Sequence, residues 1–131
     1  MIVDASALLA ILFQEPEAAQ FVTALAQADA PRISAVNYLE AAIRIDGQNS
    51  IVAVQAFEAF MELSAITIEP VSLGQMRFVR RAYAQYGKGR HRAGLNFGDA
   101  FAYALAKERD EPLLFKGDDF IHTDVRRAIQ V

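Results

Sequence analysis

The chain opens with Met1-Ile-Val-Asp4-Ala-Ser6, a short apolar run that stops at an acidic residue. Residues 1–3 predict a buried first strand with Asp4 at its carboxyl end. Apolar, helix-favouring residues follow at once over positions 6–13, and a second helix is expected over about residues 17–28. The start of the chain therefore predicts a strand followed directly by two helices.

The same unit of one strand and two helices recurs along the rest of the chain. Ser34, Ser72 and Asn96 are expected at helix starts, because their side chains can accept hydrogen bonds from the free N–H groups of a first turn. In the last helix Phe97, Phe101, Ala104 and Leu105 are expected on the apolar side. The expected segments are a strand at 32–34, helices at 35–45 and 50–63, a strand at 66–70, a helix at 73–86, a glycine-rich basic loop at 87–94, a helix at 96–109, a strand at 112–115 and an edge strand at 128–131.

Strands that alternate with helices predict the fold class α/β, with helices on both faces of a parallel sheet of four to five strands. The 131 residues contain no repeat or linker, so one domain over residues 1–131 is expected. With no Cys, the chain has no disulfide and no thiolate zinc site. No basic leader precedes the first strand and no apolar run has the length of a membrane span, so we expect a soluble, cytoplasmic protein.

The net charge of −3 hides an asymmetry along the chain. Residues 1–76 carry 2 basic and 9 acidic residues, whereas residues 77–131 carry 11 basic and 7 acidic ones. An acidic cluster beside a basic segment suits a metal-dependent enzyme that acts on a polyanion, although a solvated helix face would also explain the basic residues. Six of the basic residues lie close together: Arg77, Arg80, Arg81, Lys88, Arg90 and Arg92.

Acidic residues stand where this topology brings the chain to one edge of the sheet. Asp4 ends the first strand, Glu40 lies on the helix after the second strand, Asp99 is at the start of the last helix, and Asp118 or Asp119 follows the fourth strand. Ligands bind beyond the carboxyl ends of the strands in such sheets. Carboxylates gathered there repel one another unless a cation neutralises them, and oxygen ligands favour Mg²⁺ or Mn²⁺ over zinc.

Each of these residues also has a structural alternative. Asp4 could form a turn at the strand end, Glu40 could be a solvated helix residue, and Asp99 could satisfy backbone donors at a helix start. Ser6 could hold a carboxylate or cap the first helix, and Asn96 has the same ambiguity. Only the joint pattern favours a metal site.

Four sequence blocks give the chain a resemblance to a known family. They are Met-Ile-Val-Asp-Ala-Ser-Ala-Leu at the start, Ser-Ala-Val-Asn-Tyr-Leu-Glu, Leu-Asn-Phe-Gly-Asp-Ala-Phe-Ala-Tyr-Ala-Leu-Ala, and Leu-Leu-Phe-Lys-Gly-Asp-Asp-Phe near the end. In this order the chain resembles the PIN-domain ribonucleases, and among them the VapC toxins of bacterial VapBC toxin–antitoxin pairs. The resemblance implies a PIN-like three-layer α/β/α sandwich.

The activity implied is that of a metal-dependent endoribonuclease toxin, and the partners implied are an RNA substrate, a cognate VapB-type antitoxin and a second copy in a homodimer. Asp4, Glu40 and Asp99 fall on acidic positions of the family that bind Mg²⁺. Asp4 and Asp99 would hold the principal ion, and Glu40 and Asp119 would complete its shell or orient the attacking water. An apolar face for self-association or for the antitoxin is expected from Phe13, Phe21 and the helix that carries Ile51, Val54, Phe57, Phe60 and Met61, although most of these side chains are expected in the core.

The fourth block departs from the commoner family pattern of Thr, any residue, Asp, any residue, Asp, Phe. Phe115 stands in place of the Thr and Gly117 in place of the first Asp. Asp119, directly before Phe120, matches the remaining acid, so we expect it rather than Asp118 to complete the site. The departure leaves open how strongly a second metal ion would be held.

Other classes of protein share parts of the pattern. A haloacid-dehalogenase-like phosphatase would use Asp4 as a nucleophile, but expects a second Asp where this chain has Ser6. A response-regulator receiver expects an Asp at the end of its third strand, where this chain has Glu69-Pro70. A non-catalytic RNA-binding module, which would use the basic loop alone, is the remaining alternative.

Overall fold

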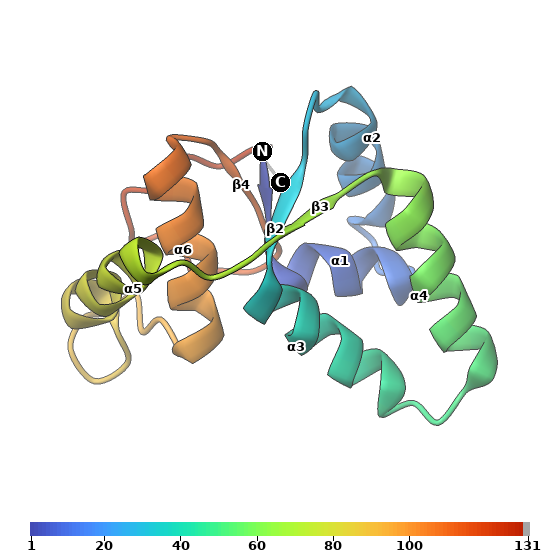
Figure 1. Ribbon diagram of the computed structural model, residues 1–131, viewed down its shortest axis with the longest axis horizontal. Coiled ribbons are helices and arrows are strands. Elements are labelled where there is room, and N and C mark those ends of the chain that lie inside the picture. Colours follow the sequence, from blue (N-terminus) through green and yellow to red (C-terminus); the bar gives the residue numbers. More distant parts are fainter. Residues whose placement is uncertain (130–131) are drawn as a thin grey trace.

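Four short parallel strands form the middle of the protein, in the order β3-β2-β1-β4 (Figure 1). The computed structural model describes residues 1–129. The strands are β1 (Ile2–Val3), β2 (Arg32–Ser34), β3 (Thr67–Glu69) and β4 (Leu113–Leu114). Each strand lies within the segment for which a strand was predicted. The α/β fold class is confirmed.

Six helices connect the strands in the predicted order. Figure 1 shows the first four on one side of the sheet and the last two on the other, which confirms the three-layer arrangement. The helices are α1 (Ala5–Leu12), α2 (Ala18–Gln27), α3 (Ala35–Asp46), α4 (Ile51–Ser64), α5 (Leu73–Tyr86) and α6 (Phe97–Arg109). None of the helices described is long and apolar enough to cross a membrane.

Polar side chains determine where these helices begin. Ser34, Ser72 and Asn96 accept backbone N–H groups at the starts of α3, α5 and α6, as predicted. Ser50 does the same for α4, and the Asp4 carboxylate caps α1 by accepting from the N–H of Ser6. A carboxylate of the proposed site is therefore also the cap that turns β1 into α1.

Neighbouring residues of the central strands point into two separate cores. Val3 and Leu114 pack with α1 to α4, whereas Ile2 and Leu113 pack with α5 and α6. Strands β1 and β4 are buried on both faces, as expected for a parallel sheet covered by helices, whereas the edge strand β3 is largely exposed. This alternation holds the carboxyl ends of β1 and β4 side by side, with Val3 paired to Leu114.

The edge strand expected at 128–131 is not formed as a strand in the part that the structure describes. Leu113 makes an isolated bridge with Arg127, with Leu113 N donating to Arg126 O at 2.8 Å and Ala128 N donating to Leu113 O at 2.9 Å. Positions 130 and 131 lie outside the described residues. The segment thus pairs with β4 at one residue only and does not continue alongside it as a strand.

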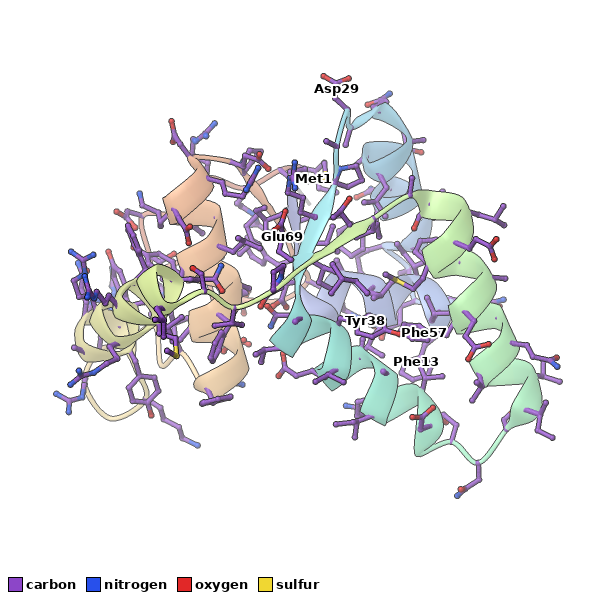
Figure 2. All side chains as sticks on the ribbon, in the orientation of Figure 1. Met1, Phe13, Asp29, Tyr38, Phe57 and Glu69 are labelled. Atoms are coloured by element: carbon purple, nitrogen blue, oxygen red, sulfur yellow. The ribbon has the colours of Figure 1, made fainter. Side chains whose placement is uncertain are left out.

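Helix α4 covers its side of the sheet with only part of its apolar surface. Phe57 is buried and stacks on Tyr38 of α3 at 5.6 Å between ring centroids, close to Phe13 (Figure 2). Val54, Phe60 and Met61 are partly buried against the same core, and Phe21 is fully buried within it, as expected for most of these side chains. Ile51, by contrast, is 77% exposed.

Helix α6 begins with an aromatic residue that the structure leaves in solvent. Phe97 was expected on the apolar side of this helix, together with Phe101, and that prediction is wrong for Phe97. Phe101 is 8% exposed but Phe97 is 70% exposed. Phe97 is the first residue of the helix, beyond the edge of the sheet, so none of the described elements covers it.

Candidate active site

The structure brings the sequence-predicted acids together around one pocket of about 460 Å³. Asp4, Glu40, Asp99 and Asp119 all line it, and Asp118 does not. They arrive from the end of β1, from α3, from the start of α6 and from the loop after β4. The pocket lies at the carboxyl edge of the sheet, where the topology predicted it.

Asp4 is buried and is held by the first turn of α1. Its Oδ2 accepts from the N–H of Ser6 at 3.0 Å and from the Ser6 hydroxyl at 2.6 Å. The same hydroxyl accepts from the backbone N–H of Lys116 at 3.0 Å, which ties the loop after β4 to the site. Of the two roles considered for Ser6, its hydroxyl therefore holds the carboxylate, whereas Asp4 and not Ser6 caps α1. The second oxygen of Asp4 remains available for a ligand.

Asp99 forms a reciprocal cap with Asn96 at the start of α6. The N–H of Asn96 donates to Asp99 Oδ2 at 3.0 Å, and the N–H of Asp99 donates to Asn96 Oδ1 at 2.8 Å. The capping alternative for Asp99 is therefore correct, but it uses one carboxylate oxygen and leaves the other free. Asp99 is 8% exposed, so the carboxylate is fixed at the pocket wall.

Glu40 lies directly against the backbone of α6. A Cβ atom placed on Gly98 would overlap the Glu40 carboxylate, so any other residue at this position would require Glu40 to move. The fully buried Asn37 joins the two elements, because its Nδ2 donates to Glu40 Oε1 at 2.8 Å and to the carbonyl of Gly98 at 3.0 Å. Glu40 is thus a positioned residue rather than a solvated one.

Asn37, Gly98 and Arg44 are site residues that the sequence reasoning missed. Asn37 was inside a recognised block, and Gly98 immediately precedes Asp99, but neither carries a charge that drew notice. Arg44 lines the pocket and is four residues from Glu40, on the same face of α3. The spacing of four residues from Glu40 could have predicted that Arg44 lies at the pocket. Its side chain brings a positive charge to the wall that the acids form.

Burial raises the pKa of two of these carboxyl groups. Loss of hydration raises the pKa of Asp4 from 3.8 to about 6 against its hydrogen bonds, and repulsion from Glu40 and Asp119 adds to the effect. Burial likewise raises the pKa of Asp99 to about 7, again with repulsion from the other three acids. The pocket therefore holds negative charge at a cost that a bound cation would relieve.

The donor set of the pocket fits a hard divalent cation. All four acids offer oxygen atoms, and within residues 1–129 none of the four forms an ion pair. No three acidic or histidine side chains in that range already stand close enough to hold one ion. The carboxylates repel one another across the pocket, and a bound divalent ion would relieve that repulsion.

A basic surface flanks this pocket on α5 and on the loop 87–96. No acidic residue occurs between Glu69 and Asp99. Nitrogen-tipped side chains project outward from this end of the molecule (Figure 2). Within the described chain none of its six basic residues is ion-paired, whereas Lys107, Arg109 and Lys116 are. The six exposed side chains are Arg77, Arg80, Arg81, Lys88, Arg90 and Arg92.

This fold and this acidic pocket define a nuclease-like α/β domain, and the comparison with known families gives its class. The model of the PIN domain matches residues 1–126, so the chain belongs to the PIN-domain family. The ribonuclease VapC28 of Mycobacterium tuberculosis is 51% identical over 130 residues, which are 98% of each chain. Within its family the chain therefore groups with the VapC ribonucleases.

Solved structures support the same fold at much lower identity. The toxin VapC20 of Mycobacterium tuberculosis, described as cleaving the sarcin–ricin loop, superposes with a TM-score of 0.75 at 13% identity over 95% of both chains. A toxin–antitoxin complex from Klebsiella pneumoniae gives 0.73 at 19% identity, over 99% of this chain and 98% of the other. At these identities the likeness concerns the fold alone.

Proposed function

We propose that this VapC ribonuclease hydrolyses RNA phosphodiester bonds with Mg²⁺ held by Asp4, Glu40, Asp99 and Asp119. The protein is an endoribonuclease toxin of a toxin–antitoxin system, because it belongs to the VapC ribonucleases at up to 51% identity over nearly its full length. It depends on a divalent metal ion, as its family does. The convergence of four acids on one pocket supports the assignment of the metal to these residues.

The chain's own residues would each do a separate task. Asp4 and Asp99 present one free oxygen each, at fixed positions, and hold the principal ion. Glu40, fixed by Asn37, and Asp119, on the exposed loop, complete the shell or orient the attacking water. The ion, when bound, supplies the activation of water and the neutralisation of charge on the phosphodiester. Mn²⁺ would satisfy the same oxygen ligands.

The cation-binding assignment predicts that Mg²⁺ stabilises the protein. At a hundredfold excess over its dissociation constant an ion bound at one site adds about 2.7 kcal/mol to the free energy of unfolding. The gain is expected to be larger at pH 8 than at pH 5.5. The raised pKa values of Asp4 and Asp99 stabilise the metal-free fold in acid, and this stabilisation is lost as the pH rises through about 6 and 7. At pH 8 both carboxyl groups are charged, so a bound cation has more unfavourable charge to neutralise. Differential scanning fluorimetry with and without EDTA measures the effect.

Asp99→Asn is the matched control for this titration. The amide oxygen can still accept from the N–H of Asn96, so the helix cap survives while the buried charge is removed. The variant should be more stable than the wild type in EDTA at pH 8 and should lose most of its response to Mg²⁺. If Mg²⁺ stabilised the variant as much as it stabilises the wild type, Asp99 would not be a ligand of the metal ion.

Cleavage of a labelled RNA tests the activity itself. The wild type is expected to cut the RNA with Mg²⁺ and to stop when EDTA is added. RNA that is bound but never cut, with any divalent ion, would favour the non-catalytic RNA-binding alternative. No observation on the site favours the phosphotransfer alternative, since the position two residues after Asp4, where that class expects a second Asp, holds Ser6.

We assign the protein to the cytoplasm, with a VapB-type antitoxin as its partner and a homodimer as its working form. The antitoxin follows from the VapC class, and the toxin–antitoxin complex from Klebsiella pneumoniae provides a structural parallel. Apolar side chains left in solvent on α4, with Ile51 at 77%, Val52 at 75% and Leu63 at 85% exposure, support a further protein contact. Multi-angle light scattering at micromolar concentration should report the mass of two chains, and a mass of one chain would contradict the dimer.

A further inference from the structure

A second pocket opens in the groove between α5 and α6. Its volume is about 430 Å³, within the range of sites that hold small molecules. Two aromatic and two arginine side chains line it (Tyr83, Phe97, Arg80 and Arg90), and small aliphatic residues form the rest of its wall. It therefore combines flat apolar surfaces with positive charge.

The first turn of α6 separates this groove from the acidic pocket. Phe97 and Ala100 line the groove, and Asp99 lines the acidic pocket. These residues fall within one helical turn of about 5.4 Å. Gly98, between them, packs against the Glu40 carboxylate. The groove and the acidic pocket therefore open on different faces of the same end of α6.

The two aromatic rings are held in place although they face solvent. Phe97 is 70% exposed, yet its ring packs on the buried Phe101 at 5.0 Å between centroids. Tyr83 is 38% exposed, and its ring lies so close to Gly87 that an added Cβ would meet it at 2.9 Å. Rings that are supported on one side and open on the other are suited to stacking with a flat ligand.

The charges of the groove select an anion as part of that ligand. Arg80 and Arg90 make no ion pair with any described residue, and the whole segment between Glu69 and Asp99 contains no acid that could pair with them. A flat ring joined to a phosphate is the chemistry of a nucleotide. A base can lie on an aromatic ring only when it is unpaired and unstacked from its neighbours.

We propose that this groove is a nucleotide subsite, in which the base of an unpaired nucleotide of the bound RNA stacks on Phe97 and Tyr83 while its phosphate binds Arg80 and Arg90. The inference rests on the proposed ribonuclease function and assigns to the RNA a contact outside the acidic pocket.

Binding in the absence of metal tests the subsite separately from cleavage. The affinity of a fluorescein-labelled single-stranded RNA is measured by anisotropy in EDTA, for the wild type and for Phe97→Ala. The loss of one stacked base is expected to weaken binding about 10- to 100-fold. Phe97→Trp should keep the affinity, because it keeps a stacking surface, whereas Phe97→Leu should behave like Phe97→Ala.

Two comparisons distinguish a stacked base from other roles of the same side chain. With RNA that carries an abasic nucleotide at the position contacted, the wild type should bind as weakly as Phe97→Ala, and the variant should lose nothing more. Phe78→Ala is the matched control, since Phe78 is an aromatic residue of α5 at 37% exposure that lies outside the groove. It should change the affinity less than twofold.

Several results would overturn the subsite. Equal affinity of Phe97→Ala and the wild type for intact RNA would do so, as would an equal loss for intact and abasic RNA. A change of mass in light scattering on Phe97→Ala would show that the face joins two copies of the chain. A wild type that binds RNA through Phe97 but never cleaves it would leave the subsite standing and would instead contradict the proposed function.

Discussion

Replacing Asp4 with asparagine is expected to reduce Mg²⁺-dependent RNA cleavage by about 10²- to 10⁴-fold. A metal ion contributes several kcal/mol to such a reaction, and each 1.36 kcal/mol corresponds to a factor of ten in rate. The fold should remain intact, because the asparagine carbonyl can accept the two hydrogen bonds from Ser6 that the carboxylate accepts now. Single-turnover cleavage of a labelled RNA, with circular dichroism on the same sample, measures both properties.

Asp118→Asn is the matched control for that experiment. Asp118 carries the same charge on the same loop as Asp119, but it does not line the acidic pocket. Its replacement should change the cleavage rate less than threefold, whereas Asp119→Asn should lower it clearly. Undiminished cleavage by Asp4→Asn would show that the catalytic metal ion does not bind in this pocket.

A single methyl group at Gly98 is expected to damage both the activity and the stability. The Cβ of Gly98→Ala would occupy the space of the Glu40 carboxylate, so Glu40 must rotate away or α6 must move from α3. Overpacking of this kind costs about 1–3 kcal/mol, and a displacement of about 1 Å at a catalytic group costs about 10²-fold in rate. Chemical denaturation and the cleavage assay measure the two losses.

Gly74 provides the control for this glycine and Glu40 provides the rescue. The nearest atom to a Cβ at Gly74 is Ser72 Oγ at 3.9 Å, so Gly74→Ala should be neutral or slightly stabilising. If the clash is the cause, then Glu40→Asp in the Gly98→Ala background should recover most of the stability, because the shorter side chain withdraws from the methyl group. No recovery would mean that Gly98 acts through another contact.

The order of strands and helices could be predicted because its signals are local. Ser34, Ser72 and Asn96 each bond an N–H within their own first turn, and the apolar runs of the strands end beside them. The acids at the strand ends then followed from the topology of a parallel sheet. Asp4 and Asp99 needed only that reasoning, together with the recognition of the family blocks.

The contacts that give the site its shape could not be predicted in the same way. Asn37 and Gly98 are 61 residues apart, and only the packing of α3 on α6 shows that they touch. The position of Phe97 was wrong for a related reason. Helical periodicity places a side chain on a face, but it does not show where the neighbouring elements stop covering that face. Both failures concern tertiary packing at the edge of the sheet.

Asn37 connects the two helical layers of the molecule directly through a hydrogen bond. Its helix belongs to the layer formed by α1 to α4, while the carbonyl that it holds belongs to the opposite layer. A force that tilts α3 is therefore transmitted to the first turn of α6, and with it to Asp99, without passing through the strands. The position of Asp99 therefore depends on how α3 packs against α6 as well as on the strands.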